Sequence, residues 1–144
     1  MALPKVTTPT YELVLPSTDK KIKFRPFLVK EEKILLIAME NDNENEIVNA
    51  IKEVVSNCTF KTLNIEQLPI FDLEYVFLQI RAKSVGEVSK FKILCPDDKK
   101  TYANVEVDLS KIEVHVDDEH TNKIIVDDKR KLGVVLKYPS LAMF

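Results

Sequence analysis

Residues 72–86 read DLEYVFLQIRAKSVG and carry the strongest helical signal in the chain. Most apolar residues in it recur every three or four positions, which places them along one side of a helix. They are Leu73, Val76, Phe77, Ile80 and Val85. Acidic residues near the start and basic residues near the end suit the partial charges of the helix termini; these are Asp72, Glu74, Arg81 and Lys83. Gly86 can adopt a positive φ and end the helix, so the stretch predicts a helix with one apolar and one charged side.

Two further helices are predicted before this one. From Val29 the apolar residues follow a helical period, with an asparagine-rich break at residues 41–45. The residues expected on one apolar side are Ile34, Leu35, Ala38 and Met39. A second apolar stripe begins near Glu44 and consists of Ile47, Val48, Ile51, Val54 and Val55. Because the link between them is so short, these two helices should pack antiparallel.

Strands are predicted on both sides of the helical segment. Alternating apolar residues flank a turn at residues 16–19 and predict a β-hairpin that ends near Pro26. After Gly86, alternation predicts strands near residues 88–95, 105–109, 112–116, 124–126 and 132–138. The links between these strands are too short for crossover connections, so the strands should be antiparallel.

These elements predict an α+β fold, with an N-terminal β-hairpin, three helices and an antiparallel, β-rich C-terminal half. A chain of 144 residues, 45% of them hydrophobic and 31% charged, is typical of one globular domain. We expect residues 1–10 to form an extended arm and residues 11–144 to form a single α+β domain. The final residues, 139–144, are apolar without a capping charge, so we expect either a longer native chain or a partner that covers them.

Charge and hydropathy argue against several classes of function. The net charge of −2 provides no broad positive field for duplex nucleic acid or an anionic membrane. No apolar run reaches the roughly 20 residues that cross a bilayer, and prolines and threonines interrupt the start where a secretory signal would be apolar. We therefore expect a cytosolic protein with two reduced cysteines.

Residues that could support catalysis, metal binding or a cofactor are few. The soft metal ligands are Cys58, Cys95, His115 and His120, and none has the close spacing of a zinc site. The paired carboxylates fall in turns or at a helix start, where water keeps their pKa ordinary. With two glycines in the chain there is no glycine-rich phosphate loop. We predict no catalytic residue, no metal and no cofactor.

One strand offers an alternative function in single-stranded nucleic-acid binding. In the segment from Lys21 to Phe27, basic residues alternate with Ile22 and Phe24, and basic and aromatic side chains together can bind a single strand. The same alternation is what any half-buried strand shows. The absence of net positive charge disfavours nucleic acid.

Protein–protein contact remains as the better hypothesis. Arg81 can make paired hydrogen bonds to a carboxylate, although an intrachain partner such as Glu31 or Glu32 would explain it equally well. The candidate partner-binding residues combine the charged helix starts, the charged side of residues 72–86 and the apolar end. They are Glu31, Glu32, Lys33, Asp72, Glu74, Arg81, Lys83, Leu141, Met143 and Phe144.

Several stretches resemble one family. These stretches are MALPKVTTPTYELVLPSTDKKIKFRPFLVKEEKILLIAME (1–40), the segment around Asn57 and Cys58, and FDLEYVFLQIRAKSVGE (71–87) with the later CPDD (95–98). They are similar to the baseplate hub assembly proteins of T-even-like, contractile-tailed bacteriophages. The resemblance spans most of the chain and is most specific at FRPFLVKEEK and EYVFLQIRAKSVGE. Relatives are generally longer, so the resemblance implies that a C-terminal part of the family is absent here.

The resemblance implies a structural or assembly role and no enzymatic activity. Such proteins help to build the central hub of the tail baseplate in the cytoplasm of the infected bacterium, and their partners are other hub proteins. Both a lasting place in the virion and a transient role as an assembly chaperone fit the resemblance, and so does association with further copies of the chain. As a mechanism we expect the helix start at residues 30–33 and the helix at residues 72–86 to form a rigid frame, while the arm and the late strands contact other hub subunits.

Overall fold

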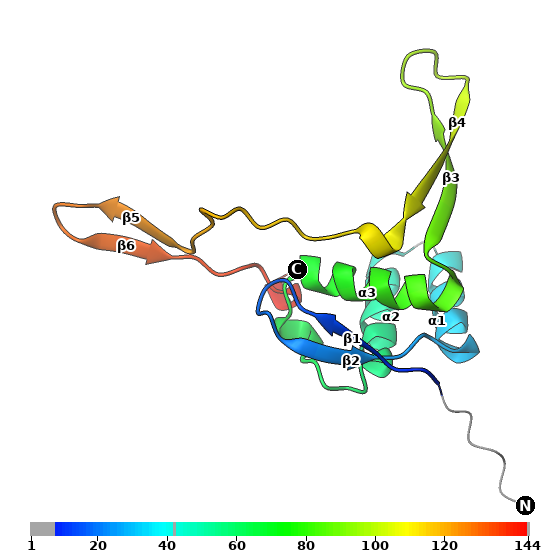
Figure 1. The fold of residues 1–144 in the computed structure, drawn as a ribbon, viewed down its shortest axis with the longest axis horizontal. Coiled ribbons are helices and arrows are strands. Elements are labelled where there is room, and N and C mark those ends of the chain that lie inside the picture. Colours follow the sequence, from blue (N-terminus) through cyan, green and yellow to red (C-terminus); the bar gives the residue numbers. More distant parts are fainter. Residues whose placement is uncertain (1–7, 42, 144) are drawn as a thin grey trace, which may run out of the picture.

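The computed structural model describes residues 8–41 and 43–143. Three helices and three two-stranded antiparallel sheets make up this part of the chain (Figure 1), which confirms the predicted α+β class. In chain order the elements are β1 (Tyr11–Val14), β2 (Lys21–Phe24), α1 (Val29–Glu40), α2 (Glu44–Cys58), η1 (Ile65–Gln67), α3 (Ile70–Val85), β3 (Val88–Leu94), β4 (Tyr102–Asp108), η2 (Leu109–Lys111), β5 (Lys123–Asp127), β6 (Leu132–Val135) and η3 (Leu141–Met143). Most of the predicted N-terminal arm, residues 1–7, lies outside the described residues.

The hydrophobic core lies where the β1/β2 hairpin packs on α2 and α3. In β2, alternation turns Ile22 and Phe24 inward and leaves Lys21 and Lys23 in solvent. The other core residues are Leu15, Val54, Val55, Cys58, Ile65, Leu68, Leu73, Val76 and Ile80. The predicted hairpin and the inward side of residues 72–86 are therefore confirmed as parts of one core.

Helix α3 begins and ends close to the predicted positions. Pro69 is its N-cap, which is acceptable because the first backbone N–H groups of a helix have no intrahelical partner. Gly86 follows the last turn with φ 134°, a conformation that L-residues rarely adopt. Val85 was expected on the apolar stripe, but it is 65% exposed, because it lies in the last turn, beyond the end of the core.

Helices α1 and α2 fold back on one another across a short link and have more mutual contacts than any other pair of helices. The prediction for the inner side of α1 is correct at Ala38, which is buried, and wrong at Met39, which is 66% exposed. Leu36 and Ile37 are exposed as well. The reason is that α1 lies at the outside of the helical body and packs mainly against α2 (Figure 1).

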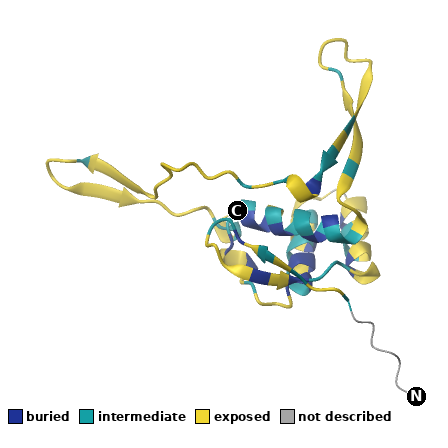
Figure 2. Cartoon of the chain, viewed as in Figure 1, coloured by how far each residue is buried: buried dark blue, intermediate teal, exposed yellow. Residues whose placement is uncertain are grey.

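The C-terminal half differs most from the prediction. The residues expected as a strand at 112–116 run extended without a partner strand, and the last strand ends at Val135 instead of reaching Tyr138. The remaining strands form two separate hairpins, β3/β4 and β5/β6, which project from the helical body (Figure 1). Figure 2 shows that nearly all of their residues are exposed.

After β6 the chain returns to the helical body. Ser140 forms an antiparallel bridge with Pro69, just before α3. The backbone N–H of Leu141 donates to the carbonyl of Leu68 at 3.4 Å, and its side chain packs against the core. The segment that carries the β5/β6 hairpin is therefore held to the body at its C-terminal end.

Candidate interaction surfaces

Glu31 is fully buried at the start of α1. Its carboxylate accepts hydrogen bonds from Arg25 Nη2 at 3.0 Å and from the backbone N–H of Leu28 at 2.9 Å, and Lys30 Nζ lies 3.3 Å away. Burial alone would raise the pKa of Glu31, but these hydrogen bonds outweigh burial and hold the pKa below its ordinary value. The carboxylate therefore stays ionised and ties β2 to the start of α1.

Asp72 is also fully buried, in the first turn of α3. It accepts a hydrogen bond from the backbone N–H of Ser17 at 3.1 Å and another from the Ser17 hydroxyl. This contact joins the turn of the β1/β2 hairpin to the N-terminus of α3, where a negative charge is favourable. We expected both Glu31 and Asp72 to contact a partner; their burial and their intrachain bonds assign them to the fold instead.

The other charged candidates lie nearer the surface. Glu32, Lys33 and Glu74 are exposed. Arg81 is half-buried and its Nη2 lies 3.5 Å from the Ser89 hydroxyl in β3. Neither suggested intrachain partner pairs with Arg81 in the described part of the chain: Arg25 binds the Glu31 carboxylate, and no ion pair joins Arg81 to Glu32.

Lys83 forms an ion pair with Glu87 and lies over the ring of Tyr11, 5.6 Å from its centroid. The hydrogen bond with Glu87 raises the pKa of Lys83. At the chain end Leu141 packs on the core and Met143 is exposed. Phe144 lies outside the described residues.

The β3/β4 hairpin has one apolar face and one mainly polar face, although the polar face also carries exposed Val88, Leu94 and Tyr102. Its register pairs Phe91 with Val105 and Ile93 with Ala103, so these side chains share one face. Phe91 is 44% and Ile93 is 49% exposed. The opposite face carries the Lys90–Glu106 ion pair, with 2.7 Å between Nζ and Oε1. We call the face formed by Phe91, Ile93, Ala103 and Val105 the β3/β4 apolar face.

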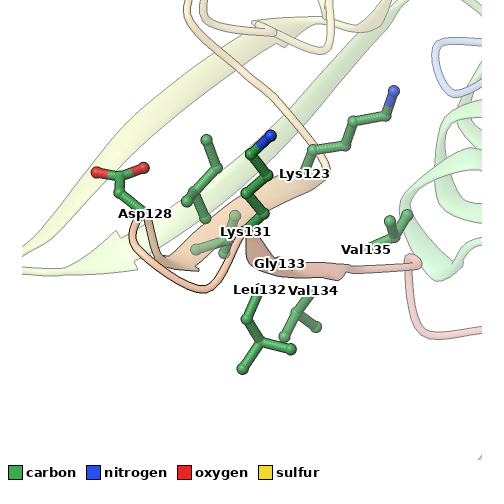
Figure 3. A pocket seen from close by; sticks show the side chains of 9 residues that line it. Lys123, Asp128, Lys131, Leu132, Gly133, Val134 and Val135 are labelled. Carbon is green, nitrogen blue, oxygen red and sulfur yellow. The ribbon is translucent and has the colours of Figure 1, made fainter.

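The β5/β6 hairpin exposes apolar side chains on both faces. Figure 3 shows Lys123 and Lys131 extending to one side, and Leu132 and Val134 to the other. Val135 pairs with Lys123, and Ile125 lies two residues after Lys123 on β5, so both point to the side of Lys123. Ile125 is 70% and Val135 is 67% exposed. The side chains of the hairpin surround a shallow hollow of about 360 Å³.

Aromatic contacts hold the base of the β5/β6 hairpin to the helical body. The Tyr138 ring packs edge-on against Phe71 of α3, with 5.0 Å between the ring centroids. The His120 ring stacks on Tyr138 at 5.8 Å, and its Nε2 lies 2.6 Å from the Tyr138 hydroxyl. Since these residues flank the hairpin in sequence, they fix where it leaves the body.

The family described as T4 bacteriophage base plate protein matches residues 8–144. The chain belongs to this family. Membership confirms the predicted relationship to baseplate proteins of T4-like phages and makes the chain a structural protein of a phage baseplate. No curated protein sequence and no solved structure matches the chain.

Little in the described part of this baseplate protein suggests reactive chemistry. Burial raises the pKa of the Cys58 thiol to about 11, so the thiol is protonated at neutral pH. Cys95 is free as well. Across residues 8–41 and 43–143, histidine, cysteine and carboxylate side chains nowhere gather in threes as they would around a metal ion, and none of the helices there has the length and apolar character to span a membrane.

The exposed apolar hairpins are what sequence reasoning missed in this baseplate protein. The sequence predicted these strands as one antiparallel, β-rich half and did not predict two separate hairpins with exposed apolar faces. A usable signal is present in the runs Ile124-Ile125-Val126 and Val134-Val135-Leu136. Consecutive apolar residues place apolar groups on both faces of a strand, and no helix is predicted after Gly86 that could cover them.

Proposed function

We propose that this baseplate protein is a subunit of the baseplate hub, which helps to assemble the hub in the host cytoplasm through contacts with other hub proteins. The observation that carries the proposal is the β3/β4 apolar face, whose Phe91 and Ile93 side chains remain exposed on a hairpin that projects from the body. Contiguous exposed apolar groups indicate an interaction site. The family supports the setting in a baseplate.

The low stability of an isolated hairpin also supports a role for β3/β4 in binding a partner. An isolated two-stranded hairpin is marginally stable in water, and both of its outer edges offer unpaired backbone groups to another chain. A partner that covers Phe91 and Ile93 would remove apolar surface from water, at about 25 cal/mol per Å², and would order the hairpin at the same time. The helical body, fixed by the buried carboxylates Glu31 and Asp72, serves as the rigid frame.

The proposal includes no reaction. The buried carboxylate of Glu31 accepts hydrogen bonds from Arg25 and the Leu28 N–H and pairs with Lys30, so it is poorly placed to move a proton to a substrate. The Cys58 thiol is protonated and fully buried, so it is a poor nucleophile.

Single-stranded nucleic-acid binding by the segment from Lys21 to Phe27 is the weaker candidate. Phe24 is in the core, and Phe27 packs against it, so their ring faces are occupied and base stacking would require them to leave. Arg25 is bound to Glu31. Exposed Lys21 and Lys23 remain, which is an ordinary solvated strand face.

Co-expression with the other hub proteins, followed by size-exclusion chromatography and mass measurement, tests the proposal. The double variant Phe91→Asp, Ile93→Asp should lower affinity for the hub complex at least tenfold, about 1.4 kcal/mol, since charge would be buried without a partner. Asn104→Asp is the matched control, because it adds a negative charge on the polar face of the same hairpin.

A folded double variant that enters the hub complex as the unmodified chain does would refute the proposed surface. The same proteins can be tested with single-stranded DNA in a mobility-shift assay at two salt concentrations. Binding that weakens with salt and is lost in Lys21→Glu, Lys23→Glu would favour the weaker candidate instead.

A further inference from the structure

A shallow groove of about 300 Å³ runs between α1 and α2, on the outside of the helical body. Its floor is apolar and includes Ile34, Ala38 and Ala50. Glu46 and Glu53 line it from α2. Among the described residues neither glutamate has a basic partner within ion-pair distance, although Glu46 Oε2 accepts a hydrogen bond from Asn41 Nδ2 at 2.6 Å.

The segment that forms most of the groove is acidic, between Lys33 and Lys52. Residues 34–51 contain no lysine or arginine, and their acidic residues are Glu40, Asp42, Glu44 and Glu46. Ile37, which also lines the groove, is 49% exposed. The groove therefore fits an apolar segment with basic side chains at its edges.

The β5/β6 hairpin has this chemistry. Its residues 123–137 contain five basic and two acidic side chains. One acidic residue, Asp127, is engaged locally, because it accepts hydrogen bonds from the N–H groups of Lys129 and Arg130 and pairs with Arg130 Nε at 3.6 Å. The face with Lys123 and Lys131 also carries Ile125 and Val135, among the most exposed apolar residues of the hairpin.

The distance between the two glutamates of the groove is close to the distance between the two lysines of the hairpin. Glu46 and Glu53 are seven residues apart on α2, about 10 Å along the helix axis. Lys123 and the turn that carries Lys131 are separated by roughly four strand residues, about 13 Å. Flexible lysine side chains can close the difference, so both ion pairs can form while Ile125 and Val135 cover the groove floor.

The hairpin and the groove of one chain cannot meet. Figure 1 shows β5/β6 extending away from the body on the side remote from α1. We propose that the β5/β6 hairpin of one copy docks in the α1–α2 groove of a second copy. Such a contact joins unlike surfaces, so it can repeat from copy to copy into rings or open chains, or close a two-fold pair in which the two copies exchange hairpins. The inference goes beyond the proposed hub role, which neither requires nor forbids it.

Sedimentation or light scattering of the purified chain over a concentration series tests self-association. The expected result is a concentration-dependent rise in mass that weakens with salt. Glu46→Lys with Glu53→Lys, and separately Lys123→Glu with Lys131→Glu, should each raise the dissociation constant at least tenfold. Mixing the two double variants should restore association, because each reversed surface then meets an oppositely charged one.

Lys99→Glu with Lys100→Glu, in the exposed β3/β4 turn, makes the same change of charge elsewhere and should leave association unchanged. Circular dichroism shows whether each variant is folded. A chain that remains monomeric at every concentration overturns the inference, and so does association that the reversals do not weaken or that mixing does not restore. The chain alone could be monomeric while the charge reversals still weaken its entry into the hub complex. In that case the groove binds another hub protein and not a second copy of the chain, and the proposed hub role stands.

Discussion

Glu31 is ionised inside the protein because Arg25 and a backbone N–H satisfy its oxygens. Arg25 is itself largely buried, with 11% of its side chain exposed, so each charge depends on the other. Removing one partner of a buried pair is costly because the remaining charge is left uncompensated.

Glu31→Gln should lower the free energy of unfolding by about 2 kcal/mol, less than full removal of a buried partner because glutamine still accepts a hydrogen bond. Urea unfolding at neutral pH followed by circular dichroism measures the loss. Glu32→Gln is the matched control, since Glu32 is exposed and should change stability by no more than about 0.5 kcal/mol. Equal losses in both variants would contradict the role of the buried pair.

The same carboxylate makes stability depend on pH. Because the pKa of Glu31 is lower in the folded than in the unfolded protein, its contribution is complete above the ordinary glutamate pKa of 4.5 and is lost as pH falls through the lower, folded value. The difference in unfolding free energy between the unmodified chain and Glu31→Gln should therefore be constant near neutral pH and shrink below about pH 4.5. A difference that does not change with pH would contradict this linkage.

The junction between α3 and β3 depends on Gly86. Its φ of 134° is strained for any residue with a side chain, although an added Cβ would meet nothing within 4 Å. Gly86→Ala should therefore lower the free energy of unfolding by about 1–3 kcal/mol through backbone strain alone. Val85→Ala, one residue earlier and exposed, should change it by less than about 0.5 kcal/mol. Equal unfolding curves for Gly86→Ala and the unmodified chain would contradict this account.

The elements that the sequence predicted well are those whose partners lie close in the chain. The β1/β2 hairpin and α3 follow from local period, turn residues and a terminal glycine. The strand predicted at residues 112–116 does not form, because alternating apolar residues give a segment one apolar face but do not supply a neighbouring strand for its backbone to pair with. The buried role of Asp72 could not be predicted, since it depends on Ser17, which lies 55 positions earlier and which only the folded chain brings close. For Glu31 the partners Arg25 and Leu28 are local, but the sequence pattern does not show that the carboxylate is buried between them.

The β5/β6 hairpin is positioned by Tyr138 through its contacts with Phe71 and His120. Tyr138→Ala should increase proteolysis and amide exchange in residues 121–137 at least tenfold and leave α2 and α3 unchanged. Tyr138→Phe keeps the ring contacts but loses the hydroxyl contact with His120 Nε2, so its exchange rate should lie between those of the unmodified chain and Tyr138→Ala. Tyr102→Ala, on the other hairpin, is the control. Unchanged exchange in Tyr138→Ala would show that the aromatic contacts do not hold the hairpin.

Taken as a whole, the molecule joins a buried helical body to two projecting hairpins. The body contains the hydrophobic core and the buried carboxylates, whereas the hairpins expose apolar side chains that a self-contained protein would cover (Figure 2). This division is what a structural subunit needs, since a stable frame can hold contact surfaces that become ordered against a neighbour.

Hydrogen–deuterium exchange, measured on the chain alone and in the co-expressed hub complex, tests this division most directly. The amides of residues 88–108 should exchange rapidly in the isolated chain, because a two-stranded hairpin opens readily, and should be protected in the complex while α2 and α3 are unchanged. Protection confined to the helices, or none at all in residues 88–108, would contradict the proposal that this protein joins the hub through its β3/β4 hairpin.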